Sequence, residues 1–275
     1  MAANPPTDLF LIADENSGPL DERLNSLLAE AARDDGRRAQ TFVAFIQSDS
    51  QATINLRPSS AEAFVSTGRC TNVYIHARGV AERDGLDIDA VLRDWLGDWY
   101  PRRIAFDSCY GGAEFIYGAL NVGGLGPTQY GYYCFVIAKT VPSATMRVAY
   151  LPGDSLKCYV STTGVVDHPT IAAVVANHAH RGHLAVCKHA ANLESDDWND
   201  LVCNPDDYIE AIFETSPTPA DVDTIRIAAA EYDRLYDLTL ALFSASATPE
   251  QLFEASVFQS LISAADLAGI PVTVI

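Results

Sequence analysis

The sequence contains no long hydrophobic run and few basic residues, and both absences restrict what the protein can do. No stretch approaches the roughly 20 apolar residues that a membrane-spanning helix needs. Lysine and arginine total 18 against 36 aspartate and glutamate residues, which gives a formal charge of −18. Because such a protein repels phosphate backbones and anionic lipids, we expect neither nucleic acid nor a membrane as a partner.

The N-terminus and the cysteines also lack the patterns of secreted and metal-binding proteins. The segment up to Asn16 has no basic region, and its apolar run from Leu9 to Ala13 is too short for a signal peptide. The six cysteines are widely spaced and form no C-x-x-C pair, which excludes a zinc ribbon and a thioredoxin motif. We therefore expect a cytoplasmic protein whose cysteines are thiols.

What the chain does have is the composition of a globular protein, with 48% hydrophobic and 20% charged residues. In its first part, apolar runs of strand length alternate with segments of helical period, which is typical of an α/β fold with a mostly parallel sheet flanked by helices. The six predicted strands are residues 9–13, 41–46, 73–75, 104–106, 132–138 and 146–151. The predicted helices are residues 20–31, 59–65, 88–99 and 113–120.

Beyond about Asp167 the pattern changes to helices. Three start signals combine a capping residue with a proline that follows closely, at Asp167-His168-Pro169, Thr218-Pro219 and Thr248-Pro249. No strand pattern interrupts this part until residues 270–275. We predict an α/β domain over residues 1–166 and a helical extension over residues 167–275.

Two reactive side chains follow neighbouring predicted strands. His76 comes directly after the third predicted strand, and Cys109 follows the fourth at a turn that leads into glycines. Ligands of open α/β sheets bind outside the carboxyl ends of the strands, so these two side chains are expected to converge on one substrate bond. A thiol nucleophile needs a base, and His76 is the expected base for Cys109.

The segment Arg103-Ile104-Ala105-Phe106-Asp107-Ser108-Cys109-Tyr110-Gly111-Gly112 resembles the nucleophile strand of metacaspases and related caspase-like peptidases, including CHAT domains. The segment Val73-Tyr74-Ile75-His76 resembles their histidine strand. The resemblance implies a cysteine endopeptidase without a cofactor, in which Cys109 forms a thioester and His76 transfers protons. Its partners would be a peptide or protein substrate and a regulatory protein.

The same resemblance implies the groups that bind the substrate. The family has a glycine after the histidine as an oxyanion donor, whereas here Ala77 and Arg78 precede Gly79, so either the Ala77 amide serves or the hole is built differently. Asp107 matches the metacaspase residue that lines a pocket for arginine or lysine, and Asp14 is expected at the same edge of the sheet. We therefore predict cleavage after Arg or Lys.

Three alternatives remain open from the residues. Cys109 could pair with a downstream histidine, as in glutamine amidotransferases; the candidates are His168, His178, His180 and His183. A caspase-like fold could also act as an inactive adaptor that binds a protein partner. Finally, a metal site could form on one helix face from His180, His183 and Cys187, with His189 nearby. No fourth ligand is indicated, and we predict no metal.

Overall fold

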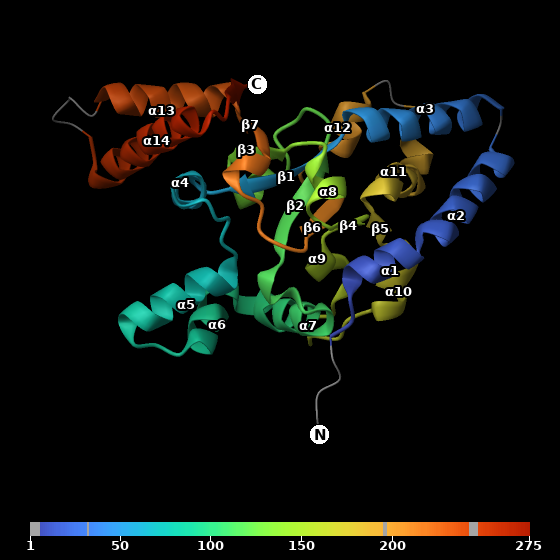
Figure 1. Ribbon diagram of the computed structural model, residues 1–275, viewed down its shortest axis with the longest axis horizontal. Coiled ribbons are helices and arrows are strands. Elements are labelled where there is room, and N and C mark those ends of the chain that lie inside the picture. Colours follow the sequence, from blue (N-terminus) through green and yellow to red (C-terminus); the bar gives the residue numbers. More distant parts are fainter. Residues whose placement is uncertain (1–5, 32, 195–196, 242–246) are drawn as a thin grey trace.

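The computed structural model describes residues 6–31, 33–194, 197–241 and 247–275. Its centre is an eight-stranded sheet in the order β5-β4-β6-β2-β1-β3-β7-β8, surrounded by helices (Figure 1). The strands are β1 (Gln51–Leu56), β2 (Ile116–Asn121), β3 (Tyr133–Ile137), β4 (Val148–Leu151), β5 (Ala176–Asn177), β6 (Glu210–Phe213), β7 (Val222–Ile227) and β8 (Val272–Val274). Within the described residues β7 and β8 are parallel and the other pairs are antiparallel.

Helices make up most of the remaining described chain. The α-helices are α1 (Leu9–Glu15), α2 (Ser17–Glu30), α3 (Arg33–Asp49), α4 (Pro58–Thr67), α5 (Val73–Asp84), α6 (Ile88–Leu96), α7 (Tyr100–Tyr110), α8 (Val141–Ala144), α9 (Ser155–Tyr159), α10 (His168–Val174), α11 (Arg181–His189), α12 (Trp198–Val202), α13 (Ala229–Ala241) and α14 (Pro249–Ala268). Short 3₁₀ turns are η1 (Gly97–Trp99), η2 (Gly112–Glu114), η3 (Thr128–Tyr130), η4 (His178–His180), η5 (Ala190–Asn192) and η6 (Pro219–Asp221).

Four of the predicted strands are helical, and the predictions for residues 9–13, 41–46, 73–75 and 104–106 were wrong. They lie in α1, α3, α5 and α7, respectively. A short apolar run has the same appearance in a buried strand and in a buried helix, so its period does not distinguish them. Capping side chains decide two of these cases, because Asp8 accepts hydrogen bonds from the backbone at the start of α1 and Asn72 does so at α5.

The mostly parallel six-stranded sheet was also wrong, whereas an α/β protein with helices around a sheet is confirmed. Residues 113–120, predicted as a helix, contain strand β2. The region 167–275, predicted to be helical before residue 270, contributes β5, β6 and β7 to the same sheet, and β6 lies between β2 and β4. Strands were correctly predicted at 132–138 and 146–151, where β3 and β4 lie.

The two faces of the sheet differ. One face carries the main core, in which Ile54, Phe135 and Phe213 pack against α3, α4, α11 and α14. At one end of the other face, Leu151 and Ile212 pack against α1, α7, α9 and α10. A third, small core joins α5, α6 and the start of α7. The middle of the second face is not apolar, and the candidate site lies there.

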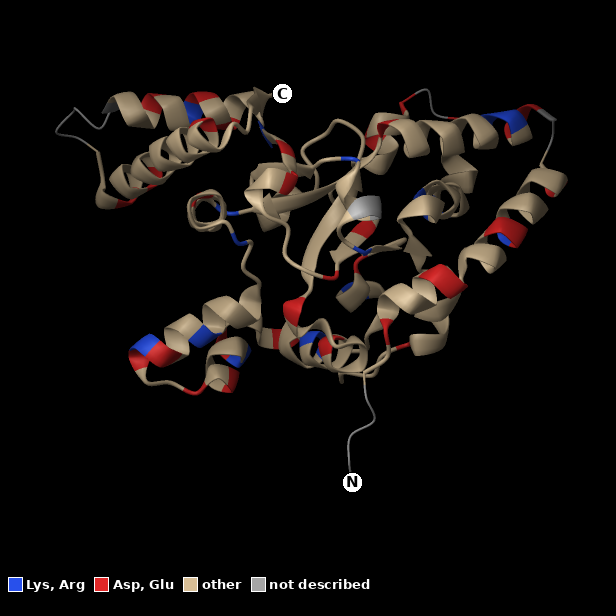
Figure 2. Ribbon diagram, in the orientation of Figure 1, with Lys and Arg blue, Asp and Glu red and all other residues tan. Residues whose placement is uncertain are grey.

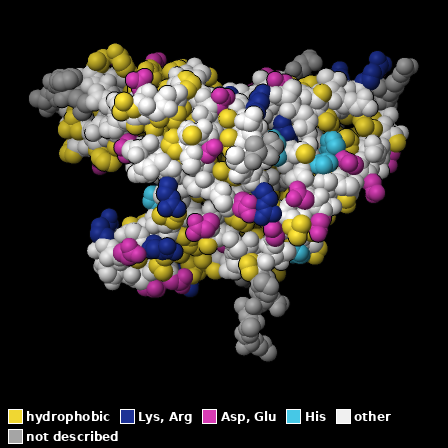
Figure 3. All heavy atoms as spheres, in the orientation of Figure 1, with side chains coloured by type: hydrophobic (Ala, Val, Ile, Leu, Met, Phe, Trp, Pro, Cys, Tyr) yellow, Lys and Arg dark blue, Asp and Glu magenta, His cyan; other side chains and the backbone are white. Residues whose placement is uncertain are grey.

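Two pairs of helices, α13–α14 and α5–α6, project from the sheet (Figure 1). The α13–α14 pair and the α5–α6 pair extend on the same side in Figure 1, and the space-filling view shows a notch between them (Figure 3). Acidic residues are distributed over helices on both sides of the molecule (Figure 2). In the described part of the chain, no helix is long and apolar enough to cross a membrane.

Candidate functional site

A polar strip runs across the middle of the second face of the sheet. Thr53 pairs with Ala119, and Ala119 pairs with Glu210, so these three side chains share one face. Asn55 lies two residues beyond Thr53 on β1 and points the same way. Asn55, Thr53 and Glu210 are all buried. Because a buried polar group is costly unless it is hydrogen-bonded, this strip needs partners.

The glycine-rich loop between β2 and β3 covers part of the strip. The Asn55 amide donates hydrogen bonds to the carbonyl oxygens of Leu125 and Gly131, at 2.8 and 2.9 Å. Gly126 has a φ of +66°, and a Cβ on it would lie 2.5 Å from Asn55 Oδ1. Only glycine fits there, because a side chain would meet both a strained backbone and the Asn55 amide group. The loop therefore forms a close cover over one end of the strip.

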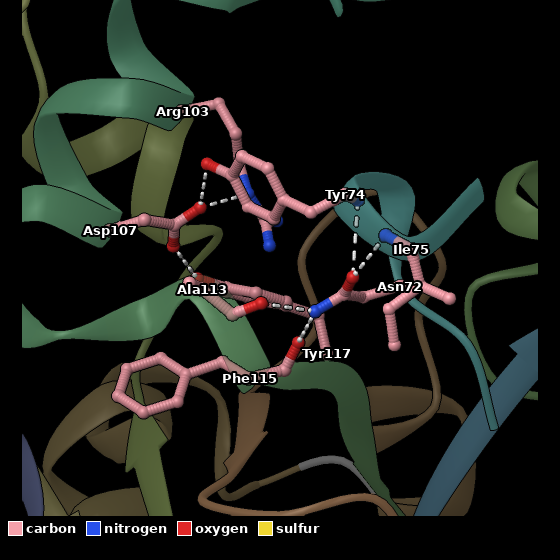
Figure 4. Close-up of polar contacts among 8 residues, drawn as sticks. All are labelled: Asn72, Tyr74, Ile75, Arg103, Asp107, Ala113, Phe115 and Tyr117. Carbon is pink, nitrogen blue, oxygen red and sulfur yellow. Dashed lines mark hydrogen bonds and ion pairs between the residues drawn. The ribbon is translucent and has the colours of Figure 1, made fainter. Parts of the chain in front are cut away.

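Asp107 is the centre of a hydrogen-bonded network beside the strip (Figure 4). Its Oδ2 accepts from Arg103 Nε at 2.6 Å and from the Tyr74 hydroxyl at 2.5 Å, and its Oδ1 accepts from the Tyr117 hydroxyl at 2.7 Å. Asn72 orients Tyr74, because it caps α5 and also donates to the Ala113 carbonyl at 2.6 Å. Both oxygens of the Asp107 carboxylate are thus occupied within the protein.

Arg103 connects this network to a cavity. Its guanidinium lies 4.0 Å from the centre of the Tyr117 ring, and its side chain lines the cavity. Burial opposes the positive charge, but Tyr117 and Asp107 together hold the pKa of Arg103 above its ordinary value. Its Nε donates a hydrogen bond to Asp107, and the Tyr74 hydroxyl lies close to the guanidinium as well. A guanidinium on a cavity wall can bind an anionic ligand, because arginine presents its N–H groups in a fixed fork geometry.

The cavity has a volume of about 210 Å³. Its lining includes Arg103, Tyr117, Tyr130, Asp154, Tyr208 and Glu210. Two smaller hollows, of about 160 and 150 Å³, share lining residues with it on either side. Because ligand pockets usually measure roughly 300–1,000 Å³, the central cavity suits a small molecule or one group of a larger one.

Glu210 supplies a buried acid to this cavity. Its side chain is 4% exposed, and its Oε2 accepts a hydrogen bond from the Ser155 amide at 2.9 Å. Burial and the nearby Asp154 charge raise the pKa of Glu210 well above its ordinary value, whereas the Ser155 hydrogen bonds and Arg103 oppose that rise. The protonated carboxylic acid is therefore favoured, and such a group can donate a proton to a bound ligand.

Asp154 supplies a second carboxyl group, held by two tyrosines. Its Oδ2 accepts hydrogen bonds from the hydroxyls of Tyr130 and Tyr208, both at 2.9 Å, and those two hydroxyls lie 3.2 Å apart. Its Oδ1 accepts from the Lys157 amide at 2.8 Å, which caps α9. The cavity thus combines a buried acid, a fixed carboxyl group and an arginine, a set that can perform acid–base chemistry on an anionic ligand.

His76 and Cys109, the predicted dyad, lie on helices and not at strand ends. His76 is exposed on α5, with its Nε2 2.6 Å from the Thr71 hydroxyl. Cys109 is partly buried on α7 and packs against the core that contains Leu9 and Phe106. Burial raises the pKa of the Cys109 thiol, which disfavours the reactive thiolate. No hydrogen bond joins His76 to Cys109 within the described residues, and the dyad stays a prediction that the placement of the two residues on α5 and α7 does not support.

The predicted substrate-binding residues are also dispersed. Ala77 is fully buried in the small core of α5 and α6, whereas Gly79 is exposed on the same helix. Asp14 is exposed at the end of α1 and accepts a hydrogen bond from Asn177. Asp107 alone adjoins the candidate site, and there it is paired with Arg103 and does not face a free pocket.

The histidines considered as alternative partners of Cys109 are engaged elsewhere. His168 Nδ1 lies 2.8 Å from the Tyr110 hydroxyl, and His178 Nδ1 lies 2.9 Å from the Tyr150 hydroxyl. His180 and His183 lie next to Asp21. None of the four is hydrogen-bonded to Cys109 within the described residues.

Sequence reasoning missed Arg103, Asp154 and Glu210. Two signals were present in the chain: Arg103 stands four residues before Asp107, the spacing of a helical ion pair, and Glu210 interrupts the apolar run from Tyr208 to Phe213. The first signal was hidden because the segment was interpreted as a strand. Comparison of the chain with protein-family models and with curated proteins finds no significant match.

Proposed function

We propose that the protein is an acid–base hydrolase for a small substrate that carries a carboxylate or phosphate group. The observation that carries this proposal is the presence of Arg103 and the buried Glu210, whose pKa is raised, on the wall of one cavity. Arg103 would bind the anionic group of the substrate, since it lines the cavity and a guanidinium can donate two parallel hydrogen bonds to a carboxylate or phosphate. The tyrosines of the lining would pack against the rest of the ligand.

The two carboxyl groups would divide the chemistry. Glu210 would donate its proton to the leaving oxygen as the substrate bond breaks, and Asp154 would accept a proton from the attacking water. The products would be two hydroxyl- or acid-bearing molecules, with one water consumed. When two carboxyl groups lie in different environments, the one with the higher pKa acts as the acid and the other as the base. Here Glu210 is the buried member of the pair and would be the acid.

The first prediction concerns Glu210→Gln, which keeps the size of the side chain but removes the acidic proton. Substrates for the measurement are 4-nitrophenyl phosphate, 4-nitrophenyl glucuronides and 4-nitrophenyl esters of dicarboxylic acids. We expect kcat/KM to fall about a hundredfold or more. In the wild type, kcat/KM should also fall as pH rises through the raised pKa of Glu210, because the acid must be protonated.

A matched control is Glu214→Gln, which changes a carboxyl group that pairs with Arg147 away from the cavity. This variant should keep the wild-type rate. Arg103→Lys should raise KM for the anionic substrates, because lysine lacks the guanidinium fork. Full activity in Glu210→Gln would overturn the proposal, and so would a wild type that turns over none of the three probe classes.

A further inference from the structure

A second cluster, remote in sequence from the cavity residues, brings together Asp21 of α2, His180 of η4 and His183 of α11. One potential ligand atom from each lies within 4.8 Å of the other two. His183 Nδ1 is 2.8 Å from Asp21 Oδ1, and His180 Nε2 is 3.4 Å from the same oxygen. The two imidazole rings are nearly perpendicular, at 81°, with their centres 5.1 Å apart. The three groups therefore converge on one small volume.

The hydrogen bond on the far side of His180 orients it toward this volume. Its Nδ1 lies 3.0 Å from Asn177 Oδ1. Asn177 uses its Nδ2 as a donor to Asp14 and Ser17, so its Oδ1 must act as an acceptor. His180 Nδ1 therefore carries the proton, and in the neutral ring the lone pair of Nε2 faces the Asp21 carboxylate. Metal-binding histidines are usually oriented by such a hydrogen bond to the second ring nitrogen.

The contact between Asp21 and His183 leaves both atoms unsatisfied. Asp21 Oδ1 and His183 Nδ1 are closed to solvent and have no hydrogen-bond partner, although they are only 2.8 Å apart. A buried carboxylate oxygen beside imidazole nitrogens is unfavourable unless a positive charge, either a proton on the ring or a metal ion, lies between them. A metal ion would satisfy all three atoms.

We propose that Asp21, His180 and His183 bind a divalent transition-metal ion of the zinc class. Two imidazoles and one carboxylate are a common three-ligand set for Zn²⁺, while Ca²⁺ and Mg²⁺ prefer oxygen ligands alone. At Zn–ligand distances near 2.1 Å, a tetrahedral site separates its ligand atoms by about 3.4 Å. The separation of His180 Nε2 and Asp21 Oδ1, 3.4 Å, agrees with that value, whereas His183 Nδ1 and Asp21 Oδ1, at 2.8 Å, would have to move apart by about 0.6 Å on metal binding. Three protein ligands leave one position for water or another ligand.

This ligand set differs from the one that the sequence suggested. Cys187 was the third member of the predicted helix face, but Asp21 takes that place and comes from a helix about 160 residues earlier in the chain. His189 is buried beside the Phe42 ring and does not belong to the cluster. Because Asp21 and His183 lie on different helices, a bound ion would join α2 to α11 and would raise the stability of the folded protein.

The test titrates the full-length, chelator-treated protein with Zn²⁺ in competition with a chromophoric chelator. We expect one Zn²⁺ per chain and a rise in melting temperature. Asp21→Ala, His180→Ala and His183→Ala should each weaken binding by more than tenfold. Asn177→Ala should weaken it by roughly 10- to 100-fold, through the lost orientation of His180. The Co²⁺-loaded protein should lack a thiolate charge-transfer band.

Two control variants separate this site from its alternatives. Cys187→Ala removes the thiol of the predicted set, and His76→Ala removes an exposed histidine on α5; both should bind Zn²⁺ like the wild type. Circular dichroism of the metal-free variants shows whether each is folded, and Asn177→Ala provides a variant that keeps all three ligands. A wild type that binds no Zn²⁺ at micromolar concentration would overturn the proposal, because the cluster would then hold only protons. A loss in Cys187→Ala equal to that in His183→Ala would also overturn it.

Discussion

The neighbours of Asp107 in the folded protein give it a different role from the one that its sequence suggests. The resemblance to metacaspases implied that it lines a pocket for a substrate arginine or lysine, and no counter-charge was indicated by the sequence. In the structure the counter-charge is Arg103, one helical turn earlier on α7, with both side chains almost fully buried. A carboxylate whose charge is already compensated by a buried arginine, and which also accepts hydrogen bonds from two tyrosines, has little attraction left for a ligand cation. Its role is to hold Arg103 and the two tyrosines in place.

Cys109 provides a prediction at the same scale. Burial raises the pKa of its thiol and limits access to it, so it should react slowly with iodoacetamide and with peptidyl electrophiles at pH 7.5. Cys158 is exposed and serves as the internal reference for alkylation in the same sample; burial and the Asp154 charge raise the pKa of its thiol as well, so the expected difference rests on access to the sulfur. Mass spectrometry of the digested protein, sampled over time, gives the two rates directly.

We expect Cys158 to be modified well before Cys109. Selective labelling of Cys109 by a peptidyl electrophile, lost in His76→Ala, would contradict this expectation and would restore the peptidase hypothesis. The adaptor hypothesis makes no demand on the thiol and remains a prediction about partner binding.

At the scale of elements, two glycines differ in the space around them: Gly118 lies between closely packed strands, and Gly79 lies on an open helix surface. A Cβ on Gly118 would lie 1.9 Å from the Thr53 carbonyl oxygen, so strands β1 and β2 approach each other there too closely for any side chain. Gly79 lies within α5, and a Cβ on it would meet nothing within 4 Å. The same substitution at the two positions should therefore have opposite effects.

Gly118→Ala should lower the free energy of unfolding by about 3 kcal/mol, because the strands must separate to admit the methyl group. Gly79→Ala should raise it by up to about 1 kcal/mol, since alanine is the better helix former. Urea unfolding followed by circular dichroism measures both. A destabilised Gly79→Ala variant would show that this glycine has a role other than filling an exposed helical position.

At the scale of the whole molecule, the sheet connects the two regions that the sequence divides at residues 166 and 167. Strand β6 pairs with β2 on one side and with β4 on the other, and β7 pairs with β3. A fragment of residues 1–166 would lack β6 and β7, and it would expose the edges of β2, β3 and β4 together with the apolar core that they cover. Exposed strand edges and apolar surface favour aggregation.

We therefore expect the fragment 1–166 to be insoluble or to unfold without a cooperative transition. The matched control removes only residues 271–275, which contain the edge strand β8 and leave Ile270 in the core. That shorter chain should remain soluble, with a lower melting temperature. A soluble 1–166 fragment with a cooperative thermal transition would contradict the single-sheet description.

The sequence by itself determined features that depend on near neighbours. The strands β3 and β4 and the capped start of α14 at Thr248 follow from local periodicity and capping chemistry, and they are confirmed. The amphipathic helix predicted over residues 88–99 is confirmed as α6 over Ile88–Leu96, and its last three residues form the 3₁₀ turn η1. Local pattern could not decide whether the apolar segments 9–13 and 104–106 were strands or helices. Both are short apolar runs, and apolar residues continue even where the segment meets solvent, as at Leu11, which is 51% exposed, so neither run shows a polar period.

Only the tertiary structure decided the strand order and the location of the candidate site. The cavity is formed by β1, α7, β2, η3, β6 and the segments around the start of α9 and before β6, and its lining extends along the chain from Asn55 to Glu210. Glu210 has a raised pKa because distant segments exclude water from it and place Asp154 beside it. Those conditions arise from long-range packing, which cannot be predicted from the spacing of residues along the chain. Capping and amphipathicity can be predicted from it, because they depend on residues only a few positions apart.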